Sequence, residues 1–120
     1  MLIGATDQDG EEPVAARALG RSDGAAAAVR AAAAGDAPWF VLSAAHGLLA
    51  PGAWAVPSPD RLDEQTPAYR DAWTAWVLAR LEAECGDLAD REVELATDDE
   101  LTSALREPLR ARGARPIPPA

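Results

Sequence analysis

The sequence contains no lysine, a single histidine and a single cysteine among its 120 residues. A lone cysteine excludes an internal disulfide, and one histidine with one cysteine argues against a zinc site. No apolar run approaches the roughly 20 residues that cross a bilayer, and the N-terminus has neither the charged nor the apolar region of a signal peptide. We therefore expect a cytoplasmic protein without a membrane segment, bound metal or cofactor.

The positive charge comes entirely from eleven arginines, which twenty acidic residues outnumber to give a net charge of -9. A negative surface repels phosphate backbones and anionic lipids, so binding to bulk nucleic acid or to a membrane is disfavoured. A group of arginines near the C-terminus could still bind one phosphate, although a solvated helix face is the simpler interpretation. These arginines are Arg106, Arg110, Arg112 and Arg115.

The length predicts one domain, residues 1–120, with a single hydrophobic core. Three short apolar segments indicate strands, at residues 1–6, 39–44 and 91–96. The second of them, WFVLSA, shows no polar alternation, which is typical of a central strand covered on both faces. The segment that follows it, residues 45–60, is rich in proline, so we predict a long loop there and no regular element.

Two further stretches indicate helices. Residues 13–34 are rich in alanine and predict two helical pieces, with glycines between them. A longer helix is predicted to begin at Thr66, a good N-cap followed by proline, and to end at Gly86. Its aromatic residues recur at helical spacing, so we expect Trp73 and Trp76 to face the core.

Leucines between residues 101 and 109 predict a last helix, which Pro108 should kink or split. Strands and helices thus alternate along the chain. This order is typical of a parallel sheet with right-handed crossovers. We therefore predict an α/β fold, a three-layer α/β/α arrangement around a central parallel sheet of three to four strands.

Polar side chains follow each of the three predicted strands. Asp7 comes after the first strand, Ser43 and His46 end the second, and Asp98 and Asp99 follow the third. In open parallel sheets, ligands bind beyond the carboxyl ends of the strands, where loops and helix N-termini offer free N–H groups. We therefore expect a substrate pocket at this edge.

The residue types at this edge suit acid–base chemistry. Ser43 could act as a nucleophile or bind substrate, and His46 could transfer a proton near neutral pH. The Gly-x-Ser-x-Gly turn of serine hydrolases is absent. The structural alternatives are that Ser43 caps a turn and that His46 is an ordinary loop residue.

Two other positions, Gly47 and Asp60, could contribute to the same pocket. Gly47 is expected to adopt a positive φ and turn the chain, and Asp60 either caps the next segment or points its carboxylate at the pocket. The carboxylates of Asp7, Asp98 and Asp99 could hold Mg²⁺ against a phosphate, but acidic residues after strands also cap helices. We predict no metal.

The stretch FVLSAAHGLLAP, the later PSPD and the helix PAYRDAWTAWVLARLEAE resemble a family of small bacterial α/β proteins of unknown function. That family carries a Ser-Ala-Lys-x-Gly-Leu motif followed by Pro-Tyr-Asp. It is distantly similar to the YaaA-like peroxide-stress proteins and to catalytic domains of archaeal tRNA-modifying enzymes of the transglycosylase type. The resemblance implies a glycosylase-like α/β/α fold.

The sequence departs from the motif at several positions. Ala45 replaces the lysine, Pro59 replaces the tyrosine, and the Cys-Gly-Lys that usually ends the first strand is missing from IGATDQ. The positions that match are Ser43, His46, Gly47 and Asp60. The pocket is therefore either refitted for a less anionic substrate or no longer catalytic.

The resemblance implies an enzyme-like domain that acts on a nucleoside, a nucleobase or a related polar metabolite, with N-glycosidic bond chemistry at the strand ends. Its catalytic residues would be Ser43, His46 and Asp60. Its substrate-binding residues would be Gly47, from the motif, and Asp7, Asp98 and Asp99, from their positions after the predicted strands. The alternative is a degenerate domain that binds another protein, or a second copy of itself, through the proline-rich loop and Trp54.

Overall fold

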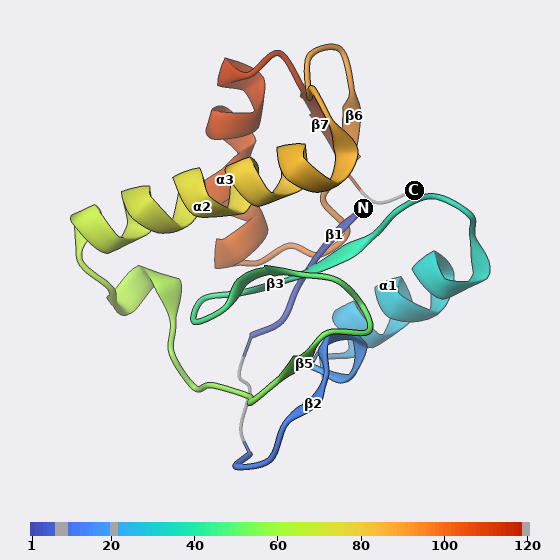
Figure 1. Cartoon of the computed structure of the whole chain (residues 1–120), viewed down its shortest axis with the longest axis vertical. Coiled ribbons are helices and arrows are strands. Elements are labelled where there is room, and N and C mark those ends of the chain that lie inside the picture. Colours follow the sequence, from blue (N-terminus) through green and yellow to red (C-terminus); the bar gives the residue numbers. More distant parts are fainter. Residues whose placement is uncertain (7–9, 20–21, 119–120) are drawn as a thin grey trace.

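The computed structural model describes residues 1–6, 10–19 and 22–118. This part of the chain folds into three α-helices, two short 3-10 helices and seven short strands (Figure 1). The helices are α1 (Asp23–Ala34), α2 (Pro67–Cys85), α3 (Glu100–Ala111), η1 (Ala16–Ala18) and η2 (Leu62–Glu64). The strands are β1 (Leu2–Gly4), β2 (Val14–Ala15), β3 (Phe40–Ser43), β4 (Gly47–Leu49), β5 (Trp54–Ala55), β6 (Glu92–Glu94) and β7 (Arg115–Ile117).

The strands form small sheets of mixed direction. β3 lies between β1, to which it is parallel, and β4, to which it is antiparallel. β2 pairs with β5 in an antiparallel ribbon, and β6 pairs with β7 in parallel. A bridge between Leu2 and Leu95, with the Ala96 N–H donating to the Leu2 carbonyl at 2.9 Å, connects β1 to the end of β6.

The predicted mixture of helices and strands is confirmed, but one central parallel sheet in three layers is not evident. The sheet that contains β3 is mixed because the chain turns back after Ser43 and pairs with itself. For the same reason the predicted long loop at residues 45–60 is wrong in part, since it contains β4 and β5. The strand predicted at 39–44 is confirmed as buried and central in its sheet, with all four residues of β3 buried.

The bounds predicted for α2 are confirmed, whereas the predictions for the other two helical regions need correction. α2 begins and ends as predicted, with the Thr66 side chain accepting a hydrogen bond from the Tyr69 N–H and Gly86 at a φ of 82°. The first of the two helical pieces predicted at residues 13–34 is instead the strand β2 followed by η1. α3 is one helix that includes Pro108, so the predicted split is wrong; the leucines on either side of the proline, Leu105 and Leu109, are buried and hold this turn against the core.

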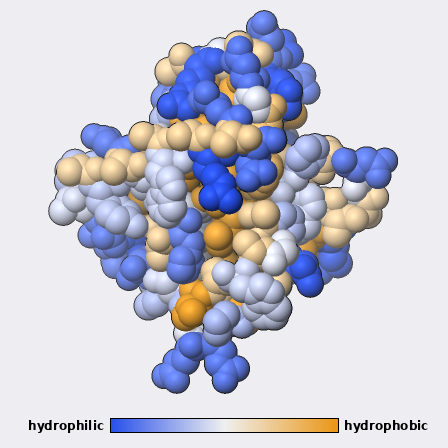
Figure 2. All heavy atoms as spheres, viewed as in Figure 1, coloured by the Kyte–Doolittle hydropathy of each residue, from blue (hydrophilic) through white to orange (hydrophobic). Residues whose placement is uncertain are grey.

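The main core lies between α2, α3 and the strands. The residues of α2 buried in it are Trp73, Val77, Leu78 and Leu81. Trp76 was predicted to face the core but is 49% exposed, since its position lies on the flank of this buried stripe. Hydrophilic residues cover most of the face in Figure 2, and the strongly hydrophobic colour is confined to small areas.

Candidate functional site

The turn that joins β3 to β4 is fixed by the serine at its start. The Ser43 side chain is 1% exposed, and its Oγ accepts a hydrogen bond from the His46 N–H at 3.3 Å. Its carbonyl accepts a hydrogen bond from the Trp73 indole N–H at 2.9 Å, inside the core. Ser43 therefore caps the turn, the structural alternative drawn from the sequence, and its catalytic role stays a prediction.

His46 connects this turn to the segment after β5. Its Nε2 lies 2.7 Å from the Val56 carbonyl oxygen. Because a carbonyl can only accept, the Nε2 atom must carry the proton in this contact, and Nδ1 is then the acceptor of the neutral ring. The geometry thus leaves Nδ1 as the atom that would take up a proton in acid–base chemistry.

Gly47 has the positive φ expected from the sequence, 73°. Residues 44–46 form a three-residue turn, and a following residue in the left-handed region is a common way to close such a hairpin. A Cβ added to Gly47 would lie 3.0 Å from the Trp76 ring. Both the backbone conformation and the ring above it therefore favour glycine here.

Asp60 and Asp7 are the two remaining residues that the sequence predicted for the substrate edge. Asp60 is exposed, and its N–H donates to the Ser58 hydroxyl at 3.2 Å. It does not cap η2, whose N-cap is Arg61, so the capping role expected for Asp60 is wrong. Asp7 lies outside the described residues.

Asp99 joins the end of β1 to the start of α3. Its side chain is the N-cap of α3, where Oδ1 accepts from the N–H groups of Leu101 and Thr102, both at 3.0 Å. The carboxylate lies so close to Gly4 that a Cβ added there would overlap it. The Gly4 N–H donates to the Thr97 hydroxyl at 2.8 Å. The end of β1 therefore meets the segment after β6, and Asp99 acts as a helix cap.

Asp98 faces elsewhere, although it is the neighbour of Asp99. It is exposed and lines a hollow between α3 and β7. Among the described residues no three histidine, cysteine, aspartate or glutamate side chains converge as metal ligands. Of the predicted site residues, Ser43, His46 and Gly47 thus share one turn, whereas Asp98 and Asp99 belong to different surroundings.

Comparison with known proteins places the chain in a family. A family model described as a family of unknown function, DUF6884, matches residues 1–119. The chain belongs to the DUF6884 family. Neither the search of curated proteins nor the search of solved structures gave a match. Within the described residues of this DUF6884 chain, no helix is long and apolar enough to cross a membrane.

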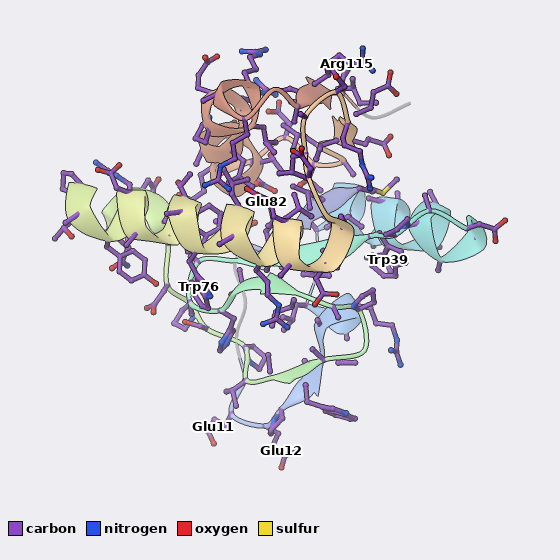
Figure 3. All side chains as sticks on the ribbon, turned by 45° about the horizontal axis from the view of Figure 1, so that its top comes forward. Glu11, Glu12, Trp39, Trp76, Glu82 and Arg115 are labelled. Carbon is purple, nitrogen blue, oxygen red and sulfur yellow. The ribbon has the colours of Figure 1, made fainter. Side chains whose placement is uncertain are left out.

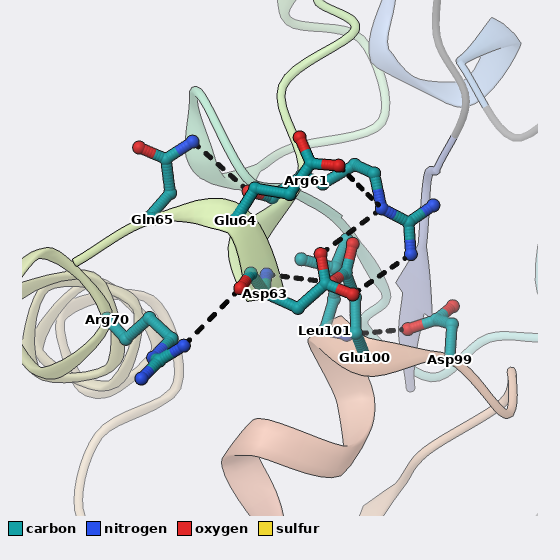
Figure 4. A network of polar contacts seen from close by, with 8 residues as sticks. All are labelled: Arg61, Asp63, Glu64, Gln65, Arg70, Asp99, Glu100 and Leu101. Atoms are coloured by element: carbon teal, nitrogen blue, oxygen red, sulfur yellow. Dashed lines mark hydrogen bonds and ion pairs between the residues drawn. The ribbon is translucent and has the colours of Figure 1, made fainter. Parts of the chain in front are cut away.

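One group near the predicted site was missed by sequence reasoning, the polar contacts that join Arg61 and η2 to the start of α3 (Figure 4). Arg61 donates to both carboxylate oxygens of Asp63, each at 3.1 Å. The Asp63 N–H donates to Glu100 Oε2 at 2.9 Å, which ties η2 to the first turn of α3. Figure 4 shows the Arg61 guanidinium and the Asp99 carboxylate on the same side of this junction, beside β1.

The two carboxyl groups of this junction titrate in opposite directions. The hydrogen bonds from Arg61 lower the pKa of the Asp63 carboxyl. Burial raises the pKa of the Glu100 carboxyl, and the neighbouring Asp63 adds to the rise. No local motif marks this pair, because the two residues are far apart in sequence and meet only in the fold.

Tyr69 belongs to the aromatic stripe of α2 that the sequence predicted as core, but it lies on an outer flank of the helix. Its hydroxyl donates to the Ala44 carbonyl at 2.7 Å, and its side chain is 38% exposed. Tyr69 and Trp76 are seven positions apart, so they lie on the same flank of α2, two turns from each other. The aromatic stripe predicted as core is therefore divided between a buried Trp73 and an outer flank that surrounds the turn.

We expect Gly47→Ala to lower the free energy of unfolding by about 1–3 kcal/mol, because alanine is strained at this φ and its Cβ meets the Trp76 ring. Gly52→Ala is the matched control, since nothing lies within 4 Å of an added Cβ there. Urea titration of the two variants checks this. Equal stabilities of the two variants would contradict the account of the turn.

We expect Glu100→Gln to change the pH dependence of stability. Because the folded pKa of Glu100 is raised, the unfolded chain ionises first, and the group lowers stability as pH rises from about 4.3 through the folded pKa. Glutamine keeps an acceptor for the Asp63 N–H but cannot ionise. Wild-type stability should therefore fall relative to the variant over this range, by less than about 1 kcal/mol because solvent screens the carboxylate.

Urea titrations of both proteins at several pH values between about 4 and 7 measure this difference. Asp63 works in the opposite direction, and because it contacts Glu100 the measured difference belongs to the pair of carboxyl groups. Parallel pH profiles would show that Glu100 is not perturbed by the fold.

Proposed function

We propose that this chain is a binding module that recognises another protein in the cytoplasm through an aromatic face, defined as Trp54, Val56, Tyr69 and Trp76. The observation that carries the proposal is the exposure of these large apolar side chains. Trp54 is 73%, Trp76 49%, Val56 42% and Tyr69 38% exposed. Such residues are rarely exposed together on a soluble domain unless they contact a partner.

Three of the four residues of the aromatic face, Val56, Tyr69 and Trp76, contact the 44–47 turn. Tyr69 bonds to Ala44, and the Trp76 ring lies against Gly47. The Val56 carbonyl holds His46 in the same turn. Figure 3 shows Trp76 projecting from α2 on the side of this turn.

Trp54 extends the face along β5. Residues 54–57 alternate exposed, buried, exposed and buried, so Trp54 and Val56 share the outer side of an extended segment. Tryptophan and tyrosine contribute large contact areas in protein interfaces and lose little conformational freedom on binding. The aromatic face therefore offers the anchors that an interface needs.

The negative charge of the chain favours a partner with basic residues at the contact. A net charge of -9 opposes association of two copies, and Asp60 and Glu64, both exposed, lie in the segment that leads from the aromatic face to α2. A partner with an apolar anchor flanked by basic residues complements this surface. Ser43, at the start of the same turn, is 1% exposed, so it adds no surface to this face.

The test places a photo-crosslinking amino acid at position 76, and in a matched control at Arg30 of α1, which is also exposed. In the cells that make the protein, we expect a defined crosslinked protein from position 76 and not from position 30. Adding Trp54→Ser should reduce its yield at least about tenfold, because a hot-spot tryptophan contributes 2 kcal/mol or more.

Two results would contradict the proposal. One is a position-76 product that Trp54→Ser leaves unchanged, since the aromatic face would then not be the contact. The other is a product of twice the mass of the chain, which would make the partner a second copy.

A second candidate is the enzyme-like role that the resemblance implies, action on a nucleoside, nucleobase or related polar metabolite with N-glycosidic chemistry. It is supported by the position of the Asp99 carboxylate at the end of β1, and by the free Nδ1 acceptor that the His46 contact implies. In this candidate β3, β1 and β6 form the parallel part of a glycosylase-like α/β/α arrangement.

Release of free base from a panel of nucleosides tests this candidate. With His46 as the acid or base, His46→Gln should reduce the release about 10²–10⁴-fold while the free energy of unfolding stays within about 1 kcal/mol of wild type. Undiminished release by a folded His46→Gln protein would remove His46 from catalysis, and no release by wild type would overturn the candidate.

A further inference from the structure

A hollow of about 490 Å³ lies between α3 and β7, away from the aromatic face and from the β3–β4 turn. We call it the arginine hollow, after the two arginines in its wall. Its lining residues are Leu95, Thr97, Asp98, Arg106, Arg110, Pro116, Ile117 and Pro118. We propose that the arginine hollow binds a small phosphate monoester, such as a sugar phosphate.

The two arginines provide the anion site. Arg106 and Arg110 are four positions apart on α3, so their Cβ atoms lie about 6 Å from each other on one side of the helix. Arg110 pairs with Glu107, whereas no carboxylate in the described part of the chain pairs with Arg106. Guanidinium groups bind phosphate through two parallel hydrogen bonds and stay charged at any physiological pH.

The fold separates this pair from the other arginines of the C-terminal group. Arg112 pairs with Glu82 of α2, and Arg115 donates to the Asp90 carbonyl at 3.2 Å. Figure 3 shows Arg115 at the far end of the β6–β7 pair, well away from Glu82. The possible phosphate cluster of the sequence is therefore reduced to two members that share one hollow.

The other lining residues of the arginine hollow indicate which chemical group carries the phosphate. Asp98 is exposed at the hollow, and its carboxylate repels a bare anion but accepts hydrogen bonds from hydroxyl groups. Leu95, Pro116 and Ile117 add apolar surface, against which the carbon skeleton of a sugar can lie. A phosphate at the arginines and hydroxyl groups at Asp98 thus describe a sugar phosphate.

The charge of the whole chain limits the size of the ligand. A net charge of -9 repels a nucleic-acid backbone or an anionic bilayer, which would have to bring many phosphates close to the surface. A single phosphate needs only the local field of the two arginines. A volume of about 490 Å³ also lies in the range of small-molecule pockets.

The experiment follows amide chemical shifts during titration with two probes, inorganic phosphate and ribose 5-phosphate, at low ionic strength. We expect saturable shifts confined to residues around the arginine hollow, and tighter binding of ribose 5-phosphate. Arg106→Gln should weaken both probes at least tenfold, and Arg110→Gln serves as an independent second variant. Arg80→Gln is the matched control, since Arg80 forms an exposed i,i+4 pair with Glu84 on α2 and should leave both affinities unchanged.

Asp98→Asn separates the phosphate subsite from the sugar subsite. Removing the negative charge should strengthen the binding of inorganic phosphate and reduce the preference for ribose 5-phosphate. The proposal is overturned if the shifts do not saturate, if Arg80→Gln weakens binding as much as Arg106→Gln, or if Asp98→Asn leaves the preference unchanged. None of these results depends on the aromatic face, so this site and the proposed protein-binding function can fail separately.

Discussion

The hydrogen bond from the Trp73 indole N–H to the Ser43 carbonyl holds the candidate site together. It lies inside the core, where an unpaired donor or acceptor costs far more than at the surface, so both groups depend on each other. It fixes the end of β3 against the middle of α2. The turn that follows Ser43, the glycine that closes it and the rings around it all take their positions from this contact.

The hydrogen bond between Trp73 and Ser43, which we call the clamp, also explains why the residues predicted as catalytic make structural contacts. Ser43 uses its hydroxyl to accept the His46 N–H, and His46 uses its ring to reach the Val56 carbonyl. These bonds stabilise a tight turn whose outer surface is aromatic. The side chains exposed around the turn are therefore not Ser43 but those that surround it, above all Trp76 and Tyr69.

Much of the fold could be predicted where the determining information is local. The apolar run of β3 predicted a buried strand, and Thr66, Pro67 and Gly86 predicted the bounds of α2, because caps and strand burial depend on adjacent residues. β4 could not be predicted in this way, since its pairing depends on the return of the chain after Gly47.

The site was harder to predict than the fold, for a similar reason. Helical spacing showed that Trp73 and Trp76 are neighbours on α2 but not which of them the core would cover. The contact of Asp99 with Gly4 arises from elements far apart in sequence. Residue types at the strand ends predicted one shared pocket, but Asp98 and Asp99 lie in different surroundings from the turn that holds Ser43, His46 and Gly47.

The most direct measurement of the clamp is hydrogen exchange at the Trp73 indole N–H, followed by NMR. If this group is held as described, it should exchange as slowly as the most protected backbone amides of α2, with the free energy of global unfolding. Exchange at a rate near that of a solvent-exposed indole, while those amides stay protected, would show that Trp73 does not hold the β3–β4 turn.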